Sequence, residues 1–212
     1  MSIEIIFSIV ILIISVVIHE VSHGYSAYMQ GDNTAYYAGR LTLNPLKHLD
    51  WVGSVLVPIV TTMLGFPFGW AKPVPFNPYN LKNQRWGELL VAIAGPLSNI
   101  AIAIVFGLIV RFGFYRLTPG FLKLSAWVVF VNLWLAIFNL LPLPPLDGSR
   151  ILFSLLPYQS NKFRQSLEKY SFLLLILIVF IIPQFSQVLS VALSFSFGVL
   201  TGHSPLSLGF VF

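Results

Sequence analysis

The most constraining feature of this sequence is an apolar run from residue 3 to about residue 29 that contains His19-Glu20-Val21-Ser22-His23. A helix over this run is long enough to cross a bilayer, which needs about 20 residues. Residues 5–14 include a single polar side chain, Ser8, so this part of the helix has no water-facing side. Ionisable side chains at membrane depth are costly and are rarely present without a function. The motif therefore marks the part of the chain where chemistry is to be expected.

Two histidines four residues apart lie on one face of a helix, one turn from each other. Their imidazole nitrogens can bind one Zn²⁺, and a glutamate directly after the first histidine lies close enough to act on water at the metal. The motif thus predicts a zinc site on His19 and His23, with Glu20 beside it. Such a site needs a third protein ligand, and the chain has no Cys to supply it.

The composition excludes a soluble globular protein. The chain has 212 residues, 57% hydrophobic and 9% charged, with a mean hydropathy of +0.84, whereas a soluble domain carries about 25% charged residues. Further apolar segments predict helices over about 88–110, 125–141 and 171–200. The last is long enough for one kinked helix, which we favour, or for a helical hairpin. We therefore expect an all-α multi-spanning protein that forms a single membrane-embedded domain over 1–212, without a cleavable signal. The net charge of +5 indicates loop orientation in a membrane, with no nucleic-acid partner.

Asp147 is the only other acid expected at membrane depth, because the remaining candidates lie at helix ends or in linkers: Glu4, Glu88 and Glu168. For Asp147 to reach the two histidines, helix 125–141 must end on the same side of the membrane as the first helix. The segment 51–68 is short and interrupted by Gly and Pro. We therefore expect this segment to be re-entrant or to form one arm of a buried hairpin, and the sequence leaves both open.

The basic residues give an orientation under this topology. One side receives nine Lys and Arg: Arg40, Lys47, Lys72, Lys82, Arg85, Arg150, Lys162, Arg164 and Lys169. The other side receives three: Arg111, Arg116 and Lys123. Because cytoplasmic loops carry the excess of positive charge, the motif is expected near the cytoplasmic side of a cell (plasma) membrane.

Three motifs, in this order along the chain, resemble those of the site-2 proteases, the intramembrane zinc metalloproteases of peptidase family M50. They are the 19–23 motif, the stretch Gly95-Pro96-Leu97-Ser98-Asn99, and the stretch Asn139…Pro142…Pro144…Asp147-Gly148. The chain is identified as a compact member, since it has neither the additional first helix nor the inserted PDZ-type peptide-binding domain of larger relatives. The resemblance implies a three-helix catalytic core, to which 51–68 and a C-terminal helix are added.

The resemblance also implies the roles of the site residues. His19, His23 and Asp147 would hold one Zn²⁺ per chain, and Glu20 would take a proton from the attacking water and pass it to the leaving amine. Asn139 would hydrogen-bond the substrate backbone or the developing oxyanion, although an interhelical polar contact explains it equally well.

The remaining polar residues receive structural interpretations. Ser98, Asn99 and Asn132 are interpreted as packing residues between helices. His48 and Asp50 are interpreted as polar loop residues, the alternative being a second metal site, and His203 as part of a polar tail.

The implied activity is hydrolysis of a peptide bond within a transmembrane segment of a single-pass membrane protein or a signal-peptide remnant. A homo-oligomeric form is compatible with the sequence. The Pro-rich stretch 72–78 could pair with the unwound substrate. One alternative is a metal-binding transporter, but residues 3–18 offer only Glu4, Ser8 and Ser15 as polar groups along an ion path. The other is a non-catalytic scaffold, and against it no ligand of the expected site is lost.

Overall fold

The computed structural model describes residues 3–51, 53, 72–156, 161–178 and 182–208. Within these residues the chain is helical and contains no strand, as the sequence predicts. Four helices are long and apolar enough to span a membrane. They are α1 (Ile3–Met29), α4 (Gln84–Gly113), α5 (Pro119–Asn139) and α9 (Pro183–Thr201). The protein is a multi-spanning membrane protein of the all-α class.

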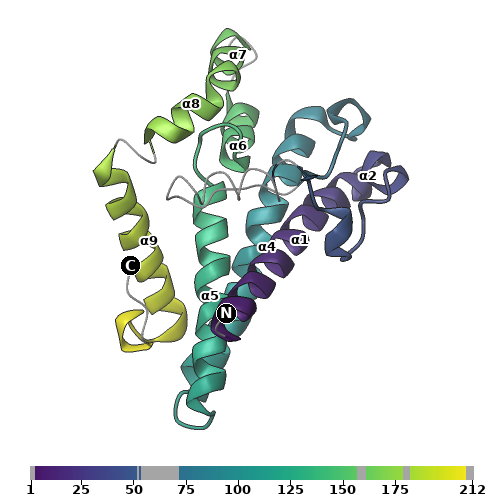
Figure 1. Ribbon diagram of the computed structural model, residues 1–212. Coiled ribbons are helices and arrows are strands. Elements are labelled where there is room, and N and C mark those ends of the chain that lie inside the picture. The colour runs from purple at the N-terminus through teal and green to yellow at the C-terminus, as the bar shows by residue number, and fades with distance from the viewer. Residues whose placement is uncertain (1–2, 52, 54–71, 157–160, 179–181, 209–212) are drawn as a thin grey trace.

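The spanning helices alternate in direction. Figure 1 shows α1 and α5 running toward one end of the molecule, and α4 and α9 running toward the other. Helix α4 packs against both α1 and α5, while α9 packs on α4 and α5. Four short helices lie near the end where α1 and α5 finish: α2 (Thr34–Tyr37), α6 (Asp147–Leu155), α7 (Asn161–Lys169) and α8 (Ser171–Ile176). Single 3-10 turns are η1 (Pro45–Lys47), η3 (Pro78–Asn80) and η6 (Leu206–Leu208).

Local sequence signals explain where the long helices begin and end. The Asn83 side chain accepts a hydrogen bond from Trp86 N at 3.0 Å and caps α4. Pro119 occupies the first turn of α5, where its missing N–H has no cost. Gly202 has φ +74° and ends α9 in the left-handed conformation that glycine adopts readily. Because of these signals, α4 and α5 begin earlier than the predicted residues 88 and 125.

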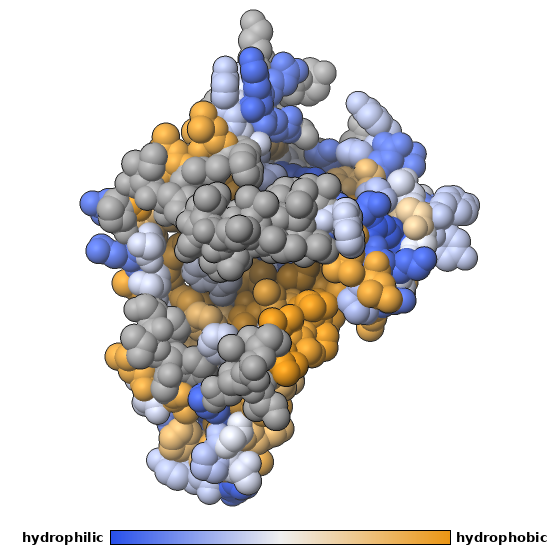
Figure 2. Space-filling model, viewed as in Figure 1, coloured by the Kyte–Doolittle hydropathy of each residue, from blue (hydrophilic) through white to orange (hydrophobic). Residues whose placement is uncertain are grey.

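The core lies between α4, α5 and α9. Its buried members are Ala103, Val110, Ala126, Val129, Leu133, Leu193 and Phe197. Small residues let these helices approach closely: a Cβ added to Gly107 would lie 2.9 Å from Leu200 Cβ. On the visible face, Figure 2 shows hydrophobic side chains gathered in a middle zone, and hydrophilic ones both toward the end that carries α2 and α7 and at the opposite end.

The structure has two helices where the sequence predicts one kinked helix over 171–200. Helix α8 ends at Ile176, and α9 begins at Pro183. Ile182 is extended, with φ −101° and ψ 95°, because proline disfavours the helical conformation of the residue before it.

The predicted re-entrant segment 51–68 lies outside the described residues, apart from Trp51 and Gly53. Its flanks meet at one end of the molecule, since Lys82 N donates to Gln30 O at 3.1 Å and Ser26 Oγ donates to Leu90 O at 3.0 Å. The chain therefore leaves α1 and enters α4 on the same side. With this arrangement, α5 can end on the same side as α1, which Asp147 needs to reach the two histidines.

Candidate metal centre

Two histidines from α1 and one aspartate from α6 meet in a buried cluster. Asp147 Oδ2 lies 3.1 Å from His19 Nε2 and 3.3 Å from His23 Nε2, and the two Nε2 atoms are 3.1 Å apart. The three residues are only 6–9% exposed. Among the described residues, this is the one group of His, Asp and Glu whose donor atoms converge closely enough for a metal ion.

The Nδ1 atom of each histidine lies at hydrogen-bond distance from a carbonyl oxygen. His19 Nδ1 lies 2.6 Å from Asn99 Oδ1, and His23 Nδ1 lies 2.6 Å from the main-chain oxygen of Val91. Because these oxygens accept hydrogen bonds, each Nδ1 carries the proton, and a neutral ring then keeps its lone pair at Nε2. Two lone pairs and a carboxylate oxygen thus face one another, an arrangement that a cation between them would stabilise. The donor set fits Zn²⁺, which binds imidazole nitrogen and carboxylate oxygen.

Gly95 on α4 leaves the space beside this cluster open. A Cβ built on this glycine would lie 2.4 Å from His23 Nε2 and 2.6 Å from His19 Nε2. Any side chain at position 95 would therefore press on the two nitrogens that face Asp147. The glycine of the second sequence motif has a steric role in the candidate site.

A buried polar network stands behind His19 and corrects the interpretation of Asn99 as a packing residue. Asn99 Nδ2 donates to Asn132 Oδ1 at 2.9 Å, and Asn132 Nδ2 donates to Ser15 Oγ at 3.0 Å. These bonds orient the Asn99 amide so that its oxygen faces His19. Both asparagines are fully buried. The sequence holds one signal for this role, since Asn99 lies one helical turn after Gly95 and hence on the same face of α4.

Tight packing at the start of α6 brings Asp147 to the histidines. A Cβ on Gly148 would lie 2.2 Å from Leu140 O and 2.3 Å from Leu141 O. Only glycine lets the first turn of α6 pack directly on the carbonyls at the end of α5. Asp147 is the first residue of α6, where the helix dipole favours a carboxylate.

Glu20 lies beside this cluster and is half-buried. Its Oε2 accepts a hydrogen bond of 2.9 Å from the backbone N–H of Val74. The Glu20 carboxylate is thus not one of the converging donor atoms. It contacts the segment that begins at Lys72.

The other residues that the sequence singles out make contacts outside the cluster. The side chain of Asn139 donates from Nδ2 to Leu135 O of its own helix at 2.9 Å. His48 is buried and its Nε2 lies 2.8 Å from Thr42 O, so it belongs to the packed loop that also carries Asp50. His203 stacks on Phe114 with ring centroids 3.8 Å apart.

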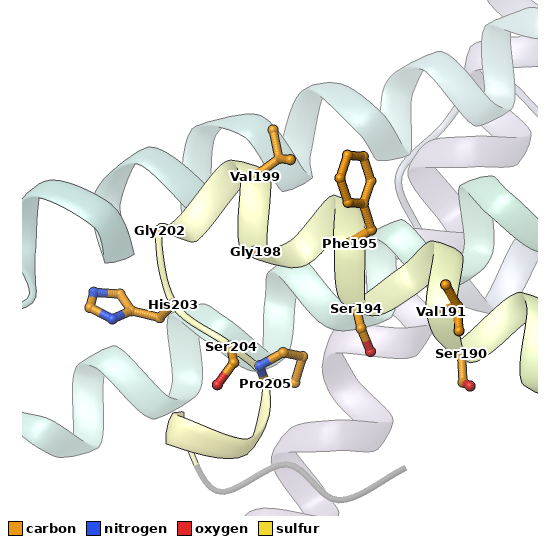
Figure 3. A pocket seen from close by; sticks show the side chains of 10 residues that line it. All are labelled: Ser190, Val191, Ser194, Phe195, Gly198, Val199, Gly202, His203, Ser204 and Pro205. Carbon is orange, nitrogen blue, oxygen red and sulfur yellow. The ribbon is translucent and has the colours of Figure 1, made fainter.

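A surface groove along α9 does not contain the cluster. It has a volume of about 700 Å³ and runs along α9, and Figure 3 shows its lining from Ser190 to Pro205. The candidate metal centre lies between α1, α4 and α6 and is separate from this groove.

Comparisons with known proteins agree with the three motifs. Residues 115–182, which include Asp147, match the model of peptidase family M50. Over 190 residues the chain is 40% identical to "Putative zinc metalloprotease YwhC" of Bacillus subtilis, and this covers 86% of the chain and 84% of that relative. The chain belongs to peptidase family M50.

Two further relatives share a lower identity with the chain. The chain is 27% identical to "Putative zinc metalloprotease Rip2" of Mycolicibacterium smegmatis over 79% of its length, and spans 64% of that relative. It is also 27% identical to the protein of the same name from Mycobacterium tuberculosis, of which it spans 65%. No solved structure matches the chain. The protein is thus a member of peptidase family M50, and His19, His23 and Asp147 form a donor group that could hold a metal ion.

Proposed function

We propose that this M50 protein is an intramembrane endopeptidase that hydrolyses a peptide bond within a transmembrane segment of its substrate. The observation that carries the proposal is the convergence of His19, His23 and Asp147 beside Glu20. Both histidines and Glu20 lie on α1, which is long enough to span a membrane, and Asp147 lies in the first turn of the short helix α6, which follows the spanning helix α5. A protease whose histidines and general base lie on a spanning helix meets its substrate at membrane depth.

In this proposal His19 Nε2, His23 Nε2 and Asp147 Oδ2 hold the zinc ion. When bound, zinc supplies a Lewis acid that polarises the scissile carbonyl and lets water give up a proton near neutral pH. The hydrogen bonds at the two Nδ1 atoms support this ligand set, because they fix the tautomer in which Nε2 is free to bind a metal.

Glu20 is the general base and acid of the proposed reaction. Its carboxylate takes a proton from the attacking water and later delivers it to the nitrogen of the leaving amine, which breaks the peptide bond. Positioned proton transfer of this kind contributes about 10²–10⁴-fold to a rate. Asn139 stays a predicted oxyanion or substrate contact; one N–H of its amide donates to Leu135 O, and the amide has a second N–H.

The substrate class follows from the membrane environment. Backbone groups of a spanning helix are hydrogen-bonded to one another, so the substrate must unwind locally before hydrolysis. We propose single-pass proteins and signal-peptide remnants as substrates, because one isolated helix can unwind without disrupting a bundle. We propose a plasma membrane location, and the nine-to-three distribution of Lys and Arg supports an orientation with the reacting end near the cytoplasm.

The test is the mapping of new protein termini in membranes of cells that express the wild-type chain or Glu20→Gln. The proposal predicts wild-type-dependent cuts inside hydrophobic spanning segments, and their loss in Glu20→Gln with zinc content retained. Cuts that fall only in water-exposed domains would contradict intramembrane cleavage. Zinc flux into proteoliposomes without any proteolysis would favour a transporter.

A further inference from the structure

The segment from Lys72 to Asn80, here called the strap, runs from the loop before α4 across α1. We infer that the backbone N–H of Val74 in the strap is a positioning group that fixes the Glu20 carboxylate beside His19. The contact is a hydrogen bond of 2.9 Å between Val74 N and Glu20 Oε2. This inference rests on the proposed function, because it gives Glu20 a role in the reaction.

Two prolines leave residues 72–76 with few backbone N–H groups, and most of these already donate hydrogen bonds within the protein. Pro73 and Pro75 have no N–H. Lys72 N donates to His48 O at 2.9 Å, and Val74 N donates to Glu20. Among residues 72–76 only the amide of Phe76 has no acceptor within the described part of the chain. Within residues 72–76 the strap therefore has one backbone N–H left for an unwound substrate, and pairing along 72–78 stays a prediction.

The side chain of Val74 packs the strap against α1. Val74 is 7% exposed, and a Cβ added to Gly24 would lie 2.8 Å from Val74 Cγ1. Gly24 directly follows the second histidine of the motif. The absence of a side chain at this position lets the strap cross α1 close enough for its amide to reach Glu20.

Two anchors hold the strap on the C-terminal side of this crossing. The fully buried carboxylate of Asp32 accepts hydrogen bonds from Asn77 N at 2.7 Å and from Asn80 Nδ2 at 3.0 Å. The Arg150 guanidinium lies 5.2 Å from the centre of the Phe76 ring, within the range of a cation–π contact. Because Arg150 belongs to α6, the strap connects the helix of Glu20 with the helix of Asp147.

The geometry gives the two carboxylate oxygens different tasks. A hydrogen bond from a fixed amide to an ionised carboxylate is shorter and stronger than one between neutral groups, so it holds Oε2 in place. Within the described residues Oε1 receives no hydrogen bond, which leaves it available for the proton of the attacking water. Misplacement of a catalytic group by about 1 Å can cost about 10²-fold in rate.

The first arm of the test removes the Val74 N–H and measures turnover of a synthetic peptide copied from a wild-type cut site mapped as above. Val74→Pro is the simple variant, and replacement of Val74 by its α-hydroxy analogue removes only the N–H. The same ester replacement at Phe76 is the matched control, since that amide has no described acceptor. We expect kcat to fall at least about tenfold with the change at 74, with KM and zinc content retained. The ester at 76 removes an amide that does not contact Glu20, so it leaves kcat within about twofold of wild type. If the Phe76 amide pairs with the substrate, its loss raises KM and leaves kcat in this range.

Unchanged kcat in the ester at 74 would overturn the inference. Loss of zinc together with kcat in that variant would also overturn it, because the amide would then support the ligands and not the base. Val74→Pro alone is insufficient if it fails to fold, whereas the ester retains the side chain that packs on Gly24.

The second arm measures amide hydrogen exchange and needs no substrate. We expect the Val74 amide to exchange severalfold more slowly than the Phe76 amide, and Glu20→Ala to remove this difference. Equal exchange of the two amides in the wild-type protein would refute the contact itself. A protected Val74 amide in a chain that cuts no membrane segment would instead contradict the proposed function, so the two failures are distinguishable.

Discussion

Gly95→Ala tests the steric basis of the candidate metal centre. The added Cβ would lie 2.4 Å from His23 Nε2 and 2.6 Å from both His19 Nε2 and His23 Cε1. An ordinary van der Waals contact begins at 3.4 Å, so the nearest ring nitrogen has to move by about 1 Å. Zinc–nitrogen bonds tolerate deviations of only about 0.2 Å. The displacement is thus about five times larger than a zinc ligand can accommodate.

The expected loss of zinc affinity exceeds that of an altered outer-shell hydrogen bond, which costs about 10–100-fold. We expect at least about 100-fold, or about 2.8 kcal/mol. The assay is zinc per chain by mass spectrometry, followed by competition with a chromophoric chelator in detergent. Gly120→Ala is the matched control, because a Cβ at this position meets no atom within 4 Å. Gly95→Ala with zinc affinity within about threefold of wild type would refute the steric argument.

Two further variants test other parts of the structure. Asn99→Leu removes the acceptor for His19 Nδ1, so zinc affinity should fall about 10–100-fold in the same competition assay. The control Ser98→Ala loses only a hydrogen bond to Gly95 O of its own helix and should bind zinc as the wild type does. Burial alone would raise the pKa of Asp32, but hydrogen bonds from Thr34, Asn80 and Asn77 outweigh it and hold the pKa below its ordinary value. Its contribution to stability is therefore complete above a pH of about 4 and is lost as the pH falls through the folded-state pKa. Asp32→Asn should lower the thermal midpoint at pH 7, and this difference from wild type should shrink in acid; a pH-independent difference would contradict it.

Local patterns in the sequence predict part of the site. Residues four apart on a helix share a face, so the pairing of His19 with His23 follows from their spacing alone. Asp147 follows from elimination, because few acids lie at membrane depth and the chain has no Cys. The lengths and hydropathy of the apolar segments likewise predict the four spanning helices.

Other features depend on how the helices pack and carry little or no local signal. The orientation of Asn99 toward His19 depends on the rotation of α4 against α1, and on the two polar groups that hold its amide. The contact on Glu20 comes from a backbone N–H, which any residue except proline would provide, so Val74 has no distinguishing side chain. The separation of α8 from α9 does have a signal in Pro183, which the sequence interpretation took as a kink.

The most direct test of the metal centre is the zinc content per chain of the purified wild-type protein, Glu20→Gln and Asp147→Ala. We expect close to one zinc per chain in the wild type and in Glu20→Gln, because Glu20 lies outside the donor cluster. We expect a clear loss of zinc in Asp147→Ala. Equal zinc affinity in Asp147→Ala and the wild type would contradict it, since the carboxylate that lies 3.1 Å and 3.3 Å from the two histidines would then not be a ligand.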